Sequence, residues 1–363
     1  MNAPLPSIAP RRNSVAKFVV LLIVLAANSC QDAGFVSSTQ SNEEKTLRSL
    51  TKANGHPLYT MKFYGDYGFA QTVGLSQTQI TSSLISSAAL RRGVSFTEQK
   101  SSDSAWGCTC FVAYGASGNP QFGRNFDWHD CIPLLLFTRP PTGYASVSMV
   151  DLEYLGYTRS NLPDGGGDKE ALLRTPLYPF DGMNEKGLTV GMMAVPAARA
   201  PYDPAKLSLG ELGTIRLILD FAATTDEAIA LLGRYNLRME DPPIHYLIAD
   251  AAGHSAAIEY INGTMSVLKN TEPWHVSTNF IITGSGAPAV SPCWRYNTAY
   301  STLTSAGGKI SPAAALTLLG AVSQTSTIWS VVYEMASGTI HVATDRTYGG
   351  ALTFVLKENL PAE

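Results

Sequence analysis

The sequence predicts an α+β protein in which helices cover packed antiparallel sheets. After residue 107, several runs of residues have the apolar pattern of strands, and they are separated by runs with the apolar spacing of helices. Runs of strands that alternate with runs of helices are typical of α+β folds. The length of 363 residues is ample for one large core or two domains, and it excludes a small disulfide scaffold.

The first predicted elements lead to a β-hairpin. Before it, we expect a short helix, a strand at 58–64 and an amphipathic helix at about 77–92. Residues 109–115 and 121–128 are apolar and extended, and Ser, Gly, Asn and Pro between them favour a turn. The two runs therefore predict a β-hairpin.

The later elements are expected in chain order as two helices, a group of strands, two helices and three closing strands. Their predicted bounds are 210–222, 225–234, 245–269, 292–305, 312–322, 327–335, 339–344 and 351–356. The run Gly165-Gly166-Gly167 lacks the Lys-Ser/Thr of a phosphate loop and predicts a loop between strands.

The N-terminal residues predict export. Arg11, Arg12 and Lys17 precede residues 18–27, an apolar run of about ten residues that is too short to span a bilayer and is typical of a signal peptide. We therefore expect residues 1–29 to be a signal peptide. Residues 27–30, Ala-Asn-Ser-Cys, loosely resemble a bacterial lipobox, so a lipidated Cys30 on a membrane and a soluble secreted or periplasmic product both remain open.

Charge and cysteine content limit the function classes. The net charge is −3 and only 15% of residues are charged, so the sequence offers no basic stripe and no nucleic-acid partner is expected. If Cys30 is lipidated and Cys108 is catalytic, three of the five cysteines remain, Cys110, Cys131 and Cys293. These three can form at most one intramolecular disulfide. A bond between Cys131 and Cys293 is conceivable in an oxidising compartment.

The hairpin carries a thiol, a guanidinium and a carboxylate. Arg124 lies sixteen residues after Cys108 and Asp127 nineteen residues after it, and the hairpin returns both toward the thiol. A thiol is nucleophilic as the thiolate, which a cation such as Arg124 favours. Strict strand alternation would place Arg124 and Asp127 on opposite faces, which implies a bulge or strand end near Asn125.

A cut at Gly107–Cys108 would supply a base on the same residue. The new α-amine, with a pKa of about 7.7 to 8.0, would take the proton of the thiol, and Asp127 would hold the amine. Gly107 suits such a cut because a residue without Cβ adopts strained backbone conformations.

These residues resemble a known family. Gly-Cys-Thr at 107–109 with Gly-Arg-Asn-Phe-Asp-Trp at 123–128 resembles the Cys-type N-terminal nucleophile hydrolases of linear amides, among them bile salt (choloylglycine) hydrolases, penicillin V acylases, acid ceramidase and a penicillin acyltransferase. GMNEKGLTVGMMAVP at 182–196 and HYLIADAAGHSAAIEYING at 245–263 resemble further family segments in the same order. The resemblance implies an αββα sandwich and cleavage of linear amide C–N bonds.

The resemblance also implies the remaining parts of the site. Asn279 would donate to the oxyanion, and Arg295 would balance the charge around Asp127 and Cys108. Residues 30–107 would be a pro-region or small subunit and residues 108–363 the catalytic domain of a self-cleaved two-subunit form. The substrate would be a small-molecule N-acyl amide, without any metal or other cofactor. Ala194 stands where bile salt hydrolases usually carry Asn, which argues against bile salt specificity.

Other interpretations remain open. The same chemistry with an amine acceptor would make the protein an acyltransferase, and an exported binding protein could keep the fold without activity. Cys110 is a conceivable nucleophile, and a papain-like pair would use His245 or His275 as base. Residues 134–137 and the loop 154–167 are candidates to shape an acyl pocket.

Overall fold

The computed structural model describes residues 40–53, 55, 58–74, 107–115, 118–129, 131–240 and 242–362. Residues 40–363 form one unit of the chain. The expectations for the signal peptide at 1–29, for Cys30 and for the helix at 77–92 lie outside the described residues. In the part of the chain that the structure describes, no helix is both long enough and apolar enough to cross a bilayer.

In the described residues, the larger sheet has nine strands. Its neighbours are antiparallel except for the parallel pair β2 and β5. The strands, in spatial order, are β1 (Thr51–Lys52), β2 (Tyr59–Phe63), β5 (Pro133–Thr138), β6 (Ser146–Asp151), β7 (Pro179–Asn184), β8 (Thr189–Ala194), β11 (Ile244–Ala249), β12 (Ser255–Ile261) and β13 (Thr264–Lys269).

The described part of the second sheet has seven strands and contains the predicted hairpin. In spatial order they are β14 (Trp274–Ser277), β3 (Gly107–Gly115), β4 (Pro120–Asp127), β16 (Thr327–Glu334), β17 (Thr339–Thr344) and β18 (Leu352–Val355), with β15 (Lys309–Ile310) pairing parallel to β3. A separate parallel pair is formed by β9 (Ser208–Gly210) and β10 (Asn236–Arg238).

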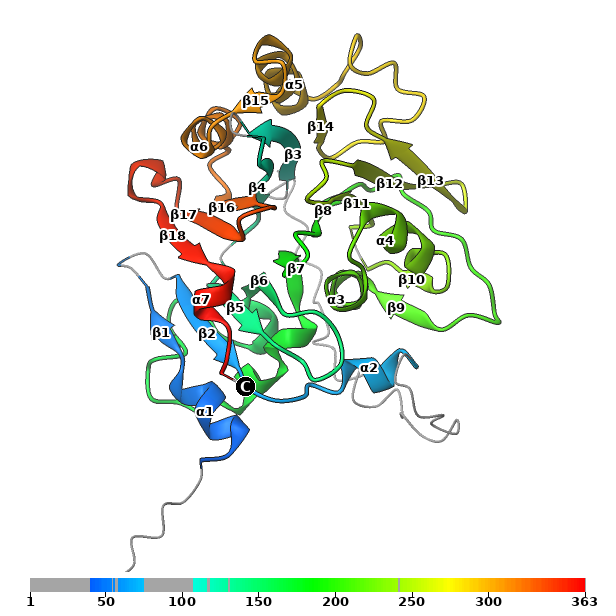
Figure 1. The fold of residues 1–363 in the computed structure, drawn as a ribbon. Helices are drawn as coiled ribbons and strands as arrows, with labels where there is room; N and C mark the ends of the chain where they lie inside the picture. Colours follow the sequence, from blue (N-terminus) through cyan, green and yellow to red (C-terminus); the bar gives the residue numbers. More distant parts are fainter. Residues whose placement is uncertain are drawn as a thin grey trace, which may run out of the picture. The chain divides into compact units, whose positions relative to one another are not determined.

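Helices cover the outer faces of both sheets (Figure 1). The larger sheet carries α3 (Glu211–Phe221) and α4 (Thr225–Leu232), whereas α5 (Trp294–Ser305) and α6 (Pro312–Ala321) pack on the second sheet. The remaining helices are α1 (Asn42–Arg48), α2 (Phe69–Thr72), α7 (Leu356–Asn359) and 3-10 turns at Leu152–Leu155, Glu170–Leu177 and Tyr348–Gly350. The order helix, sheet, sheet, helix confirms the predicted αββα sandwich.

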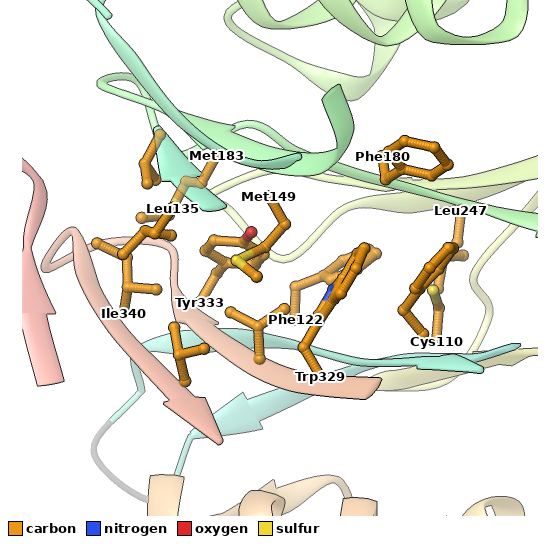
Figure 2. Packing of buried hydrophobic residues seen from close by; sticks show 14 of the residues in the cluster. Cys110, Phe122, Leu135, Met149, Phe180, Met183, Leu247, Trp329, Tyr333 and Ile340 are labelled. Carbon is orange, nitrogen blue, oxygen red and sulfur yellow. The ribbon is translucent and has the colours of Figure 1, made fainter. Parts of the chain in front are cut away.

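The main core lies between the two sheets. Figure 2 shows Phe180, Met183 and Leu247 of the larger sheet facing Phe122 and Trp329 of the second sheet. Trp329 stacks on Phe126 with 4.0 Å between ring centroids. Burying both inner faces removes most apolar side chains of β3 and β16 from water, which stabilises the sandwich and fixes strand register.

The described residues 51–74 contribute two strands, β1 and β2, to the larger sheet. Leu58, Tyr59 and Met61 are almost fully buried, and β2 pairs with β5 along its whole length. The Tyr67 hydroxyl donates to the carboxylate of Asp220 on α3 at 2.8 Å. This segment is therefore an integral part of the sandwich.

The predicted elements agree closely with the observed ones. Residues 339–344 form β17 with the expected bounds, and each predicted helix after residue 200 is present within two residues at its start and end. One detail is wrong. The strand β4 keeps strict alternation, and the bulge lies in the neighbouring strand β16, between Thr327 and Trp329.

The cysteine pairing is also corrected. Of the described cysteines, Cys108, Cys110, Cys131 and Cys293 are all free, so the conceivable Cys131–Cys293 disulfide is wrong. Cys131 packs in the core between the sheets, whereas Cys293 caps α5 on the outer face of the second sheet. One sheet therefore lies between the two thiols.

The turn between β7 and β8 gives a test of the sandwich. Gly187 has a φ of 79°, and a Cβ there would lie 2.1 Å from the Met335 carbonyl oxygen. Gly263 has a similar φ of 76° with nothing within 4 Å. We expect Gly263→Ala to lower the free energy of unfolding by about 1 kcal/mol and Gly187→Ala by roughly 3 kcal/mol, measured by urea denaturation. Equal losses would contradict this packing of the turn.

Candidate active site

The hairpin register places three predicted site groups on one face. Cys110 lies directly opposite Arg124, and Cys108 lies opposite Phe126, so all of these side chains point into the space between the sheets. Arg124 Nη2 is 3.7 Å from Cys108 Sγ, and Nη1 is 3.4 Å from Cys110 Sγ. One guanidinium therefore contacts both thiols.

Arg124 is held by a carboxylate that sequence reasoning missed. Its Nε lies 2.7 Å from Asp181 Oδ2 of β7, and both side chains are 0% exposed. Asp181 also accepts from Trp329 Nε1 at 3.1 Å and from the Tyr333 hydroxyl at 2.5 Å. Arg124 Nη1 donates to the Met192 carbonyl. Arg124 thus pairs with Asp181 across the two sheets.

Asp127 faces the opposite side of the second sheet. Its carboxylate accepts from the Thr327 hydroxyl at 2.5 Å and from Gln324 Nε2 at 2.6 Å. Arg295 Nη1 lies 3.9 Å from Asp127 Oδ2. Thr327 and Gln324 were missed because the bulge in β16, which sets Thr327 opposite Asp127, has no signature in the sequence.

Gly107 is in close contact with the same groups. A Cβ on Gly107 would lie 2.4 Å from Gln324 Nε2 and 3.2 Å from Asp127 Oδ2. Its φ is outside the left-handed region, so the expected backbone strain is absent and the need for glycine is one of space. The Asp127 carboxylate therefore lies beside the backbone that precedes Cys108.

Asn279 and Arg295, which are far from the hairpin in sequence, converge on the backbone of Cys108. Asn279 Oδ1 accepts from the Cys108 N–H and from Arg295 Nη2, each at 2.8 Å. Arg295 Nη1 donates to the Cys108 carbonyl and to Thr109 Oγ1, the latter at 3.0 Å. Asn279 Nδ2 donates to the Ala194 carbonyl at 2.9 Å. The structure therefore brings the other four predicted catalytic residues together around Cys108 and the backbone beside it.

The uncut chain keeps the thiol protonated. Burial raises the pKa of the Cys108 thiol, Arg124 lowers it and Asp127 raises it, with a net upward shift. Burial also raises the pKa of Cys110 to about 12. Arg124 thus favours the thiolate as expected, but burial outweighs the cation in the uncut chain.

In the part of the chain that the structure describes, neither His245 nor His275, the histidines proposed for a papain-like pair, forms a hydrogen bond with Cys108. His275 Nδ1 lies 3.1 Å from Ser255 Oγ, and burial lowers the pKa of His275 to about 4. His245 Nε2 lies 2.7 Å from the Thr278 carbonyl. Both rings form hydrogen bonds with groups other than the Cys108 thiol, which argues against an imidazole as the general base.

The segment 134–137 does not form a pocket. Leu134, Leu135 and Leu136 are 0% exposed, because β5 lies between β2 and β6 and both of its faces are covered. The partly exposed apolar side chains that pack against the core containing Cys108 include Trp128, Tyr154, Met192 and Leu212.

Known proteins resemble this chain over its central part. Residues 108–280 match the family model of the linear amide C-N hydrolases, choloylglycine hydrolase family. A penicillin V acylase of Pectobacterium atrosepticum is 26% identical over 189 residues, 47% of this chain and 49% of that protein. The chain thus spans about half the length of this curated relative.

Solved structures give more distant matches. A mutant of the conjugated bile acid hydrolase from Clostridium perfringens aligns with a TM-score of 0.47 and 14% identity, covering 69% of this chain and 93% of that chain. Penicillin V acylase from Agrobacterium tumefaciens aligns with a TM-score of 0.46 and 19% identity, covering 65% and 83%.

The Arg124–Asp181 pair predicts a large effect on stability. Asp181→Asn leaves Arg124 buried without its counter-charge, and we expect it to lower the free energy of unfolding by about 3 kcal/mol or more in urea denaturation near pH 7. The control is Asp226→Asn, which removes a pair with Lys269 in which both side chains are more than half exposed. That change is expected to leave stability unaltered within error. A loss of the same size in both variants would refute the structural importance of the buried pair.

Proposed function

We propose that the protein is a linear amide C-N hydrolase that hydrolyses N-acyl amides with Cys108 as nucleophile, a proposal supported by the match of residues 108–280 to the model of the choloylglycine hydrolase family. The observation that carries the proposal is the convergence on one residue. Arg124 approaches the Cys108 thiol, while Asn279 and Arg295 bind its backbone N–H and carbonyl. A residue that serves only as core packing needs no such set of polar partners on both its side chain and its backbone.

Self-cleavage would convert the site to its active form. The Cys108 nitrogen is an amide in the uncut chain and cannot act as a base. Sγ would attack the Gly107 carbonyl carbon to form a thioester, while the thiol proton passes to the leaving Cys108 nitrogen. Water would then hydrolyse the thioester, releasing a Gly107 carboxylate and a free Cys108 α-amine and thiol. The proximity of Asp127 to Gly107 and the lack of room for a side chain there support this step.

The acyl transfer then follows from the same groups. The α-amine accepts the thiol proton, and the thiolate attacks the carbonyl carbon of the substrate amide. Asn279 Oδ1, which already accepts from this nitrogen, keeps the amine oriented. We assign the oxyanion to Asn279 Nδ2, a contact that typically contributes on the order of 3 kcal/mol. The ammonium returns its proton to the departing amine, and water hydrolyses the resulting thioester.

A two-subunit mature form is consistent with the fold. The described residues 58–74 contribute β2 to the larger sheet and bury Leu58, Tyr59 and Met61. Separation of this segment after a cut at residue 107 would expose these side chains and an edge of β5, both of which are unfavourable in water. We therefore expect both fragments to remain associated.

The site of action is a proposal from the N-terminal sequence. A signal peptide at residues 1–29 would export the protein, and lipidation of Cys30 would attach it to a membrane, whereas cleavage near Ser29 would release it. The substrate class proposed is a small N-acyl amide with an apolar acyl group, because Trp128, Tyr154, Met192 and Leu212 pack beside the core that contains Cys108.

Hydrolysis assays test the proposed activity. On a panel of fatty, aryl and bile acid amides, we expect the wild type to cleave at least one class, and Cys108→Ala to lose about a thousandfold or more in kcat/KM. Cys110→Ala is the matched control, since Cys110 contacts the same guanidinium, and it is expected to keep activity within about tenfold. Transfer of the acyl group to an added amine instead of water would assign an acyltransferase. The proposal fails if no amide is cleaved or if Cys108→Ala retains activity.

Intact mass and N-terminal sequencing test self-cleavage. We expect the purified wild type to contain two fragments, the larger beginning at Cys108, and Cys108→Ala to remain one chain. Size-exclusion chromatography should show both wild-type fragments in one peak. Cleavage of Cys108→Ala at the same bond would show that another protease makes the cut.

A further inference from the structure

The loop that carries Asn279 passes between the two sheets. It follows β14, whose last residue Ser277 lies opposite Cys110 in the second sheet. The next residue, Thr278, is fully buried, and the backbone N–H groups of Ile282 and Thr283 donate to Glu259 of the larger sheet. The position of Asn279 relative to Cys108 therefore depends on what holds this loop at both ends.

His245 of β11 holds the loop immediately before Asn279. Its Nε2 lies 2.7 Å from the Thr278 carbonyl and 3.2 Å from Ser277 Oγ. A carbonyl only accepts, so this nitrogen carries the hydrogen in that contact. The ring is 0% exposed, and its Nδ1 lies 3.7 Å from Glu259 Oε1.

Glu259 of β12 holds the loop immediately after Asn279. One carboxylate oxygen accepts from the Ile282 N–H at 2.5 Å and the other from the Thr283 N–H at 3.0 Å. The side chain is 0% exposed. Burial alone would raise the pKa of Glu259, but hydrogen bonds from its partners, including these two backbone groups, lower it to about 2, so the carboxylate is charged throughout the neutral range.

We infer that His245 and Glu259 are positioning residues, which fix the loop 278–283 and thereby aim Asn279 at the Cys108 nitrogen and the forming oxyanion. This inference rests on the proposed function for its kinetic consequence, but not for its structural one. It also gives a role to the segment 245–263, which the sequence singled out and the proposed reaction does not otherwise use.

The arrangement has a clear physical basis. Asn279 makes three hydrogen bonds to three separate segments, through Cys108, Arg295 and Ala194. Donors and acceptors must hold their places to within a fraction of an ångström for such a side chain to act on a transition state. A charged carboxylate that binds two successive N–H groups holds a loop more rigidly than a neutral acceptor does.

Hydrogen exchange measured by mass spectrometry tests the structural part. Glu259→Gln retains size but has one accepting oxygen, so the Ile282 or Thr283 N–H must face an NH₂ group. We expect exchange in peptides covering 278–283 to be at least about tenfold faster than in the wild type. Asp220→Asn is the matched control, because Asp220 is also a buried carboxylate, on α3, and it contacts Arg216 and Tyr67. Equal exchange of this segment in both variants would overturn the inference.

Kinetics on the matured fraction, quantified by intact mass, test the consequence for Asn279. We expect Glu259→Gln to lower kcat by about tenfold to a hundredfold with KM changed less than about threefold, and Asp220→Asn to change neither.

His245→Gln, whose amide can donate to the Thr278 carbonyl, should retain a higher kcat than His245→Leu. If Glu259→Gln does not fold, the comparison of the two His245 variants tests whether the loop 278–283 must be held for Asn279 to act. Equal kcat in the two His245 variants would overturn the inference. A wild type inactive on every amide would refute the proposed function, while the exchange comparison would still decide whether the loop is held.

Discussion

The antiparallel register of β3 and β4 is the constraint on which the site depends. It sets Gly107 opposite Asp127, Cys108 opposite Phe126 and Cys110 opposite Arg124. Because successive strand residues face opposite sides, the thiols and Arg124 enter the space between the sheets, whereas Asp127 faces α6 and β16. A slip by one residue would exchange these faces, and the thiol would lose its guanidinium. The buried apolar faces on both sides of the hairpin prevent that slip.

Within this frame, the buried charges are each held by identifiable partners. Arg124 is neutralised by Asp181, and Asp181 is held by Trp329 and Tyr333. Asp127 is held by Thr327 and Gln324. A buried charge is tolerated only with such partners, since ions lose several kcal/mol of hydration on burial. The partners also limit side-chain movement, so the groups around Cys108 are arranged before any substrate binds.

The sequence predicted the parts of this site that depend on local pattern. Period-two alternation and turn residues located the hairpin, and offsets from Cys108 selected Arg124 and Asp127. Asp181, Thr327 and Gln324 could not be found in this way, because they reach the site through sheet-to-sheet packing and a bulge in β16. The segment 134–137 was misread since a short apolar run has the same composition whether it lines a pocket or a buried strand.

The expectation for Gly107 shows a second limit of sequence reasoning. Glycine was predicted for its backbone freedom, whereas the structure uses its lack of a side chain beside Gln324 and Asp127. A need for backbone freedom and a need for a missing side chain both select glycine. The sequence alone therefore does not distinguish them, whereas the contacts in the structure do. In the same way, an Arg beside a Cys predicts activation, but burial of the thiol reverses the net shift of its pKa in the uncut chain.

Mass spectrometry of acid-quenched reactions shows directly whether Cys108 forms the acyl-enzyme. With a cleavable N-acyl amide in excess, we expect an added acyl mass on a peptide that begins at Cys108, with the thioester on Cys108 and none on Cys110. The added mass should disappear after hydroxylamine treatment. An acyl group on Cys110 would contradict the role of Cys108 as nucleophile. So would turnover in which the quenched enzyme carries no thioester.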